Sequence, residues 1–198
     1  SIPSPAKQYS TNVARIFITV ILVIPLASPL AIHAAASIVR TPLATQNTYE
    51  HEYQMARFLQ KYYSGKTIAA TDIGAIAYYA DVFLVDLWGL GTLESAKLKR
   101  AGVYTTQDIA RIARQNDAAI ALVYDKWFEE YGGVPPEWQK AGEWTVEENI
   151  ILKDNTLSFY ALHPEEWQNL VKNLRSFSSE LSPTTKQSGA FLLSETLQ

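Results

Sequence analysis

Residues 16–39 read IFITVILVIPLASPLAIHAAASIV, a stretch of 24 residues between Arg15 and Arg40 that contains no Lys, Arg, Asp or Glu. At a rise of about 1.5 Å per residue, a helix of this length measures roughly 36 Å, enough to cross a hydrocarbon core of about 30 Å with some tilt. The chain after Arg40 mixes polar and apolar residues. The sequence therefore predicts a transmembrane helix over 16–39 that carries a water-exposed domain.

Two other interpretations of the same stretch are open. In a cleavable secretory signal, Lys7 and Arg15 would form the basic region and Ala34–Ala36 the cleavage pattern, so that the mature chain would begin at Ser37. The apolar run is, however, longer than the roughly 7–15 residues usual for such a signal. In a soluble protein the stretch would instead be a buried core helix, which is usually shorter.

Charge predicts the orientation of the helix. Lys7 and Arg15 precede it without any acidic residue, whereas Glu50 and Glu52 soon follow it. The positive-inside tendency then places the N-terminus in the cytoplasm and the large domain in the periplasm of a bacterial inner membrane. The absence of cysteine is compatible with that compartment. The net charge of −3 and the pI near 5.6 argue against a nucleic-acid partner.

The organisation expected from these patterns has four parts: a cytoplasmic segment 1–15, the transmembrane helix 16–39, an extracytoplasmic α/β domain 40–178, and a Ser/Thr-rich flexible tail 179–198. Within the domain, short apolar strands alternate with amphipathic helices. We expect strands in 66–72, 82–89 and 118–125, helices in 49–65, 92–102, 105–117 and 163–177, and a hairpin in 149–162. Asn47 or Thr48 is expected to cap the first of these helices, and a Thr each of the next two.

This alternation predicts a three-layer-like α/β domain with a mostly parallel sheet, followed by a C-terminal β-hairpin and a helix. Asp72 ends the apolar run of the first predicted strand and Asp86 that of the second, and each is followed within three residues by a glycine, Gly74 or Gly89. Ligands of open α/β sheets bind beyond the carboxyl ends of the strands, so both acids are candidate ligand contacts. The residues favour a structural role for each acid somewhat more, in which the carboxylate accepts backbone N–H groups of the next turn, and the two roles are compatible.

Other kinds of site have weaker support. The sequence has no Cys and contains no metalloprotease motif and no phosphate-binding loop. His33, His51 and His163 are scattered, and each is expected to be a packed or exposed residue and not a ligand. Aromatic residues are numerous, and Trp or Tyr faces can stack on sugar rings as well as fill a core. We therefore expect no catalytic residue, metal or cofactor in this chain.

Two segments carry a family resemblance: 71–79, TDIGAIAYY, and 85–91, VDLWGLG. They resemble the extracytoplasmic C-terminal domain of bacterial multi-pass glycosyltransferases of the GT-C type, in which a similar D-I-G-x-I-x-Y-Y … D-x-x-G-L pattern follows the last membrane helix. The resemblance covers roughly residues 13–175, and its specific part is about twenty residues long. It implies weak ligand contacts near the acceptor side from Asp72, Gly74, Tyr78, Tyr79, Asp86, Trp88 and Gly89.

The resemblance implies a part in transferring a sugar from a polyprenyl-phosphate donor to an acceptor outside the cytoplasm. That family's catalytic acid lies in an early loop between N-terminal membrane helices, which this sequence does not include. The chain is then either the terminal piece of such an enzyme or a relative without catalysis. Its expected partners are the lipid bilayer, other membrane helices packed against 16–39, and a polyprenyl-linked sugar or glycan acceptor. A single-span accessory subunit of a membrane complex is the alternative, and a secreted binding protein the third.

Overall fold

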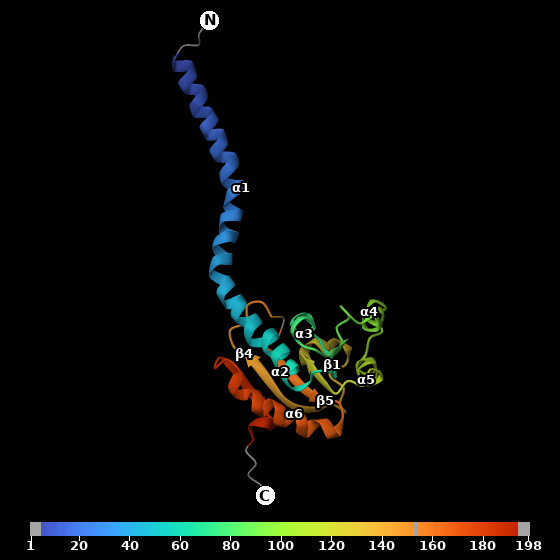
Figure 1. The fold of residues 1–198 in the computed structure, drawn as a ribbon. Coiled ribbons are helices and arrows are strands. Elements are labelled where there is room, and N and C mark those ends of the chain that lie inside the picture. The colour runs from blue at the N-terminus through green and yellow to red at the C-terminus, as the bar shows by residue number, and fades with distance from the viewer. Residues whose placement is uncertain (1–4, 153, 194–198) are drawn as a thin grey trace. The chain divides into compact units, whose positions relative to one another are not determined.

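The computed structural model describes residues 5–152 and 154–193, apart from the side chains of residues 5–14 and 16. The chain divides into two compact units, residues 1–42 and residues 43–198. Helix α1 (Pro5–Thr48) supplies the first unit and the start of the second. The second unit contains a sheet with helices on both of its faces (Figure 1).

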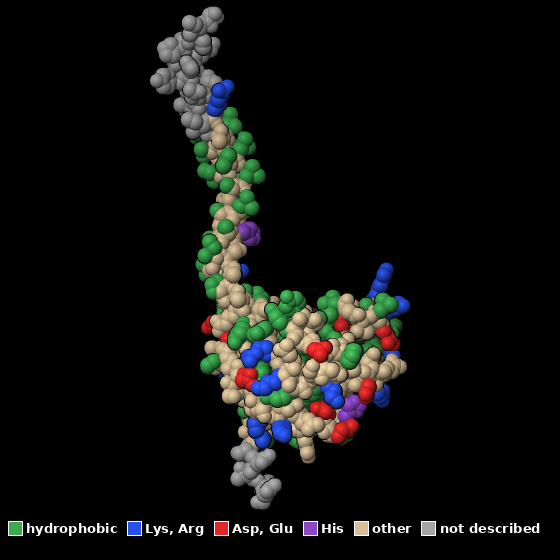
Figure 2. Space-filling model, in the orientation of Figure 1, with side chains coloured by type: hydrophobic (Ala, Val, Ile, Leu, Met, Phe, Trp, Pro, Cys, Tyr) green, Lys and Arg blue, Asp and Glu red, His purple; other side chains and the backbone are tan. Residues whose placement is uncertain are grey.

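The first unit is helical and apolar. Among the described residues, one helical stretch, Phe17–Tyr62, is long and apolar enough to cross a membrane. An 18-residue segment of it has a mean hydropathy of 2.1, and none of that segment is buried. Pro25, Pro29 and Pro42 lie inside α1 without ending it. Figure 2 shows hydrophobic side chains along this unit. The stretch 16–39 thus has the length and composition of a membrane-spanning helix.

The helix does not restart at Asn47 or Thr48, so the predicted cap is wrong. Thr48 has helical dihedral angles and makes no capping bond, and the chain continues through a π-helical turn, Tyr49–Tyr53, into α2 (Gln54–Tyr62). The Asn47 side chain contacts a distant loop instead. Its Nδ2 donates to the Glu148 carbonyl at 2.5 Å, and its Oδ1 accepts from the Ile150 N–H at 3.0 Å. Both polar atoms of the Asn47 side chain therefore bond the loop and not the backbone of the helix.

The sheet has six strands in the order β2-β1-β3-β5-β4-β6. Their bounds are β1 Thr67–Ala70, β2 Phe83–Asp86, β3 Ile120–Val123, β4 Gln139–Val146, β5 Thr156–Ala161 and β6 Thr185–Gly189. Strand β1 is parallel to β2 and to β3, whereas the other three neighbouring pairs are antiparallel. The prediction of a mostly parallel sheet is therefore wrong. Antiparallel neighbours such as β4 and β5 can be joined by a loop without a crossover helix, and the sheet from β3 onward is built from such pairs.

Helices cover both faces of the sheet, as the three-layer prediction requires. Helices α2 and α6 (Pro164–Phe177) and the short α3 (Gly74–Tyr79) pack on one face around Phe58, Trp144 and Phe159. Helix α5 (Thr106–Gln115) packs on the other face with the 3₁₀ segment Asp125–Tyr131. Helix α4 (Leu93–Arg100) precedes α5. The residues of β1 and β3 alternate between the two cores because successive strand side chains point to opposite faces.

The C-terminal part differs from expectation in two places. The hairpin exists, but its first strand is β4 and not residues 149–152, and the connection spans 147–155, of which residue 153 lies outside the described part. The predicted flexible tail is wrong as far as residue 193, because β6 pairs with β4 from Val146↔Thr185 to Gly142↔Gly189 and Phe191 is buried. Residues 194–198 lie outside the described part. An edge strand is held through its backbone, so a polar Ser/Thr-rich segment can form one.

Candidate functional site

The order of the strands in the sheet reverses between β1 and β3. From β1 the chain passes through α3 to β2, which lies on one side of β1. From β2 it passes through α4 and α5 to β3, which lies on the other side of β1. The two connections pack on opposite faces of the sheet. This arrangement is a topological switch point, where open α/β sheets form a crevice beyond the carboxyl ends of the strands. Thr71 and Asp72 follow β1 there, and Tyr124 and Asp125 follow β3.

Hydrogen bonds hold the two strand ends together at the switch point. The Thr71 N–H donates to the Leu122 carbonyl at 3.2 Å, and the Tyr124 N–H donates to Thr71 Oγ1 at 3.4 Å. Thr71 is buried. The positions of Asp72 and Tyr124 are thereby tied to each other and not only to their own strands.

The Tyr124 ring packs against His51 of the π-helical turn. Tyr124 Oη lies 3.2 Å from His51 Nδ1, and both side chains are buried. Burial lowers the pKa of His51 to about 4, despite a hydrogen bond to the Trp144 backbone and the nearby charges of Asp154 and Glu50. Burial likewise raises the pKa of Tyr124 well above its usual value, and the charges of three nearby carboxylates add to this. Both groups are therefore neutral near pH 7.

Two carboxyl groups share this region. Burial and then the charge of Asp72 raise the pKa of Glu52. Burial raises the pKa of Asp72 as well, and the charge of Asp86 adds to the effect, whereas the Gly74 N–H that donates to Asp72 Oδ1 at 3.3 Å opposes it. Glu52 and Asp72 are both half-buried, and carboxyl oxygens in such positions are acceptors able to bind ligand hydroxyl groups. Asp72 and Gly74 thus stand where the sequence predicts, at the carboxyl edge.

Asp86 has a different role in the structure. Its side chain is only 1 % exposed. Oδ1 accepts from the Trp88 N–H at 2.7 Å and Oδ2 from the Gly91 N–H at 2.5 Å. Each carboxylate oxygen is thus directed to the backbone of the loop after β2, which is the structural role that the sequence left open.

An aromatic row connects the loop after β2 with the switch point. The ring centroids of Trp88 and Trp127 lie 4.7 Å apart, and those of Trp127 and Tyr124 lie 4.8 Å apart. The Lys99 ammonium lies 3.0 Å from the centroid of the Trp88 ring. Gly89 has a φ of +96°, and a Cβ on it would lie 2.8 Å from the Ala96 nitrogen. This glycine therefore allows α4 to approach the loop, and nothing assigns it a ligand.

The two predicted tyrosines lie on α3. Tyr78 is 82 % exposed and Tyr79 47 %. Their rings contact each other with centroids 4.7 Å apart, and Tyr79 also packs edge-on against Tyr53 at 5.2 Å. The ring contacts of Tyr78 and Tyr79 thus lead to the π-helical turn, whereas those of Trp88 lead to Tyr124.

Sequence reasoning missed the residues that surround Tyr124. His51 and Glu52 come from the π-helical turn, and Asp154 from the loop before β5. One signal was present: His51, Met55 and Phe58 recur at helical spacing and are all buried. A second was that Tyr124 follows an apolar strand just as Asp72 does. Asp154, which is paired with Lys126 at 3.3 Å, carries no such local signal.

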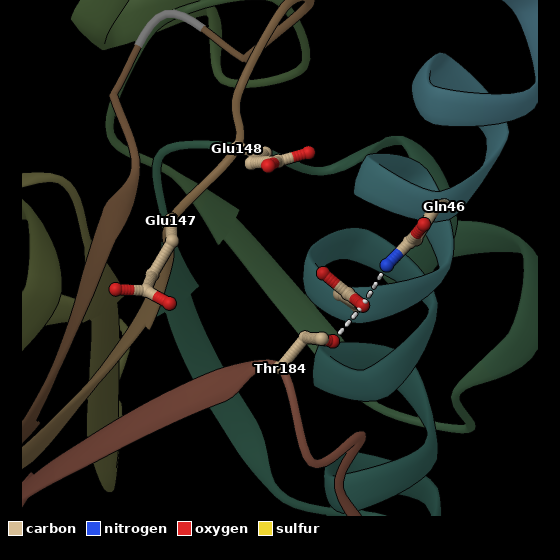
Figure 3. Close-up of a pocket in the computed structure, with 5 residues that line it drawn as sticks. Gln46, Glu147, Glu148 and Thr184 are labelled. Carbon is tan, nitrogen blue, oxygen red and sulfur yellow. Dashed lines mark hydrogen bonds between the residues drawn. The ribbon is translucent and has the colours of Figure 1, made fainter.

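A separate small cavity of about 110 Å³ lies beside the end of α1. It is lined by Gln46, Glu50, Glu147, Glu148 and Thr184 (Figure 3). Glu50 Oε1 accepts hydrogen bonds from Gln46 Nε2 at 2.7 Å and from the Thr184 hydroxyl. In the part of the chain that the structure describes, no group of three His, Cys, Asp or Glu side chains could hold a metal ion. Of the lining acids, Glu50 thus accepts hydrogen bonds and Glu147 forms an ion pair with Lys186.

Comparison with known proteins gives one match. A family model described as a domain of unknown function (DUF8728) matches residues 40–160. This range begins at Arg40, directly after the apolar stretch, and includes β1 to β4 and most of β5 with the switch point. Neither the curated proteins nor the solved structures contain a match.

Proposed function

The chain belongs to the DUF8728 family, and we propose that it is a membrane-anchored extracytoplasmic domain that binds a carbohydrate acceptor in a GT-C-like glycosyl-transfer system. It acts in a bacterial inner membrane and does not catalyse transfer by itself. The apolar stretch 16–39 supplies the anchor. The switch point at the carboxyl ends of β1 and β3 supplies the binding site.

The observation that carries this proposal is the pairing of carboxyl groups with aromatic rings at the switch point. Asp72 and Glu52 are half-buried acceptors, suited to the hydroxyl groups of a sugar. The row Trp88–Trp127–Tyr124 ends at Tyr124, on which the charges of Asp72 and Glu52 act, and the apolar face of a sugar ring stacks on indole rings such as those of this row. Carbohydrate binding needs both features within one region.

The same geometry favours binding over catalysis. His51 and Tyr124 are buried and neutral, and their hydrogen bond is directed to each other. The family resemblance also assigns the catalytic acid to a loop between other membrane helices. In this proposal, a multi-pass part of the system supplies the sugar donor site and the acid, and the domain holds the acceptor.

The test uses the full chain in lipid nanodiscs. Soluble oligosaccharides and a short-chain polyprenyl-phosphate sugar are titrated while tryptophan fluorescence and heat release are recorded. Asp72→Asn keeps an oxygen for the Gly74 N–H but removes the charge. A hydrogen bond to a charged group is worth about 1.5–3 kcal/mol, so we expect affinity to fall by roughly 10-fold or more.

Asp117→Asn is the matched control, because Asp117 is exposed and precedes β3 at the opposite edge of the sheet. Its affinity should equal that of the unmodified chain. The proposal fails if no carbohydrate binds at millimolar concentration, or if Asp72→Asn and Asp117→Asn bind it equally well.

The composition of the first unit favours a second candidate function, that of a single-span accessory subunit. Pro25 and Pro29 each remove a backbone hydrogen bond in the apolar stretch, and neighbouring helices commonly compensate for such losses in membranes. Mild extraction from native membranes should then recover the chain with other membrane proteins. The double change Pro25→Leu with Pro29→Leu should reduce that recovery, and purification as a single species in both cases would exclude this function.

A further inference from the structure

Four tyrosines form a continuous ladder on the second unit. Tyr49 stacks on Tyr53 at 5.6 Å between ring centroids, Tyr53 meets the edge of Tyr79 at 5.2 Å, and Tyr79 meets Tyr78 at 4.7 Å. We call these residues the tyrosine ladder. Three of its four members, Tyr49, Tyr79 and Tyr78, are exposed. Figure 2 shows hydrophobic side chains gathered on the part of the unit that contains α3.

A second exposed apolar pair lies near the start of the same unit. Ile150 and Ile151 are about half exposed, in the loop between β4 and β5. Asn47 holds this loop through its bonds to the Glu148 carbonyl and the Ile150 N–H. The bonds tie the two isoleucines to the turn of helix that precedes Tyr49. Folding therefore gathers exposed apolar residues from three segments around the first residues of the unit.

The chemistry of these residues suits a lipid interface better than a water-facing surface. Tyrosine has an apolar ring and a hydroxyl group, and it is enriched where hydrocarbon meets the headgroups. Exposed apolar residues that gather in one place mark an interaction surface, whereas single ones need no explanation.

The chain itself limits how far this surface can lie from the membrane. Asn47 is eight residues after Val39, the last residue of the apolar stretch, and both lie in α1. Eight helical residues span about 12 Å. The headgroup layer on each side of the hydrocarbon core is roughly 5–8 Å thick. The ladder begins two residues after Asn47, so the chain tethers its first residue within about 15 Å of the end of the apolar stretch.

We propose that the tyrosine ladder, together with Ile150 and Ile151, is a lipid-contacting surface that seats the domain on the outer headgroup layer. The proposal rests on the membrane anchoring of the proposed function but not on carbohydrate binding. Seating by this surface would hold the loop after β1, which leads into α3, close to the membrane. A lipid-linked sugar would meet the domain there.

The absence of cysteine allows a direct test with single spin labels. The full chain is reconstituted in nanodiscs that contain lipids with a nickel-chelating headgroup. One variant carries a nitroxide at Ala77→Cys, an exposed position of α3 next to the ladder. The control carries it at Gln168→Cys, an exposed position of α6. We expect several-fold stronger relaxation by the nickel lipids at residue 77 than at residue 168.

Changes in the surface itself complete the test. Tyr78→Ser with Tyr79→Ser, and separately Ile150→Ser with Ile151→Ser, should reduce the nickel effect at residue 77 while thermal unfolding stays cooperative. Equal nickel effects at residues 77 and 168 would overturn the proposal. Spin–spin broadening at residue 77 without any nickel effect would also overturn it, since a second copy would then cover the surface. Carbohydrate titration of the same variants separates this result from the proposed function.

Discussion

At the scale of single residues, the loop after β2 depends on Asp86. The sequence places an acid there and leaves its role open, and the structure directs both of its oxygens to backbone N–H groups. The Asp86 N–H in turn donates to Thr92 Oγ1 at 2.9 Å, and its carbonyl accepts from Ser95 at 3.1 Å. Thr92 stands at the N-cap position of α4, as predicted, but its side chain makes no capping hydrogen bond and accepts from the loop instead.

Asp86→Asn tests this role. The amide nitrogen of Asn cannot accept a hydrogen bond, so one of the two loop N–H groups loses its partner in a buried place. Leaving such a group unsatisfied costs about 1–3 kcal/mol. We expect a loss of unfolding free energy of that size in denaturant titrations, against less than about 0.5 kcal/mol for the exposed Asp117→Asn. Equal stability of the two variants would show that the loop does not depend on the charge.

His51 makes stability depend on pH. Its pKa is about 4 in the folded chain, against the ordinary histidine value of 6.5 that applies once the chain unfolds. Between these values the unfolded chain binds a proton that the folded chain does not, so unfolding becomes easier as pH falls from 6.5 towards 4. The loss can reach about 3 kcal/mol, since one pKa unit corresponds to about 1.4 kcal/mol. His51→Gln should flatten the unfolding free energy over this range, and an unchanged slope would exclude His51 as its source.

At the scale of secondary-structure elements, the edge of the sheet was the least predictable part. Helix α5 begins as the sequence predicts, with Thr105 as its cap, and the structure adds a capping box between Thr105 and Asp108. Strand β6 could not be predicted in this way, since its residues are mostly polar and its partner β4 lies some forty residues earlier in the sequence. Gly142 and Gly189 make that pairing possible: a Cβ on Gly142 would lie 2.3 Å from the Phe191 ring, and Gly189 has a φ of +126°.

Phe191→Ala tests whether the segment after residue 178 is part of the core. Phe191 is 1 % exposed and packs with Trp144 and Leu174 in the core on the α6 side. Removing a buried Phe side chain typically costs about 3–5 kcal/mol. Leu193→Ala is the control, because Leu193 is 71 % exposed. If both variants lose equally little unfolding free energy in thermal and denaturant unfolding, the segment after residue 178 is not part of the core.

At the scale of the whole molecule, the apolar first unit and the folded second unit imply a sidedness. In the proposal, the second unit faces the outside of the inner membrane. The charges near the span support it, with basic residues before the span and Glu50 and Glu52 after it. Sidedness decides which substrates the switch point can meet, because polyprenyl-linked sugars are used outside the cytoplasm in the family that the sequence resembles.

Lys172→Cys measures the sidedness. The residue is exposed on α6, and the chain has no other cysteine. In spheroplasts, a membrane-impermeant maleimide should label this variant before lysis as fully as after it. A cysteine at residue 172 that reacts only after lysis would place the domain in the cytoplasm and contradict the proposed function.

The sequence by itself determined the apolar helix, the α/β class and the positions of most helices and strands, because these depend on local composition and periodicity. Asp72 could be placed at the carboxyl edge for the same reason. Tertiary structure alone decided the antiparallel half of the sheet, the edge strand β6, and the surroundings of Tyr124, which come from residues 51, 52 and 154. Strand pairing and buried polar contacts join residues that are distant in sequence, and their free energy depends on burial that no local pattern specifies.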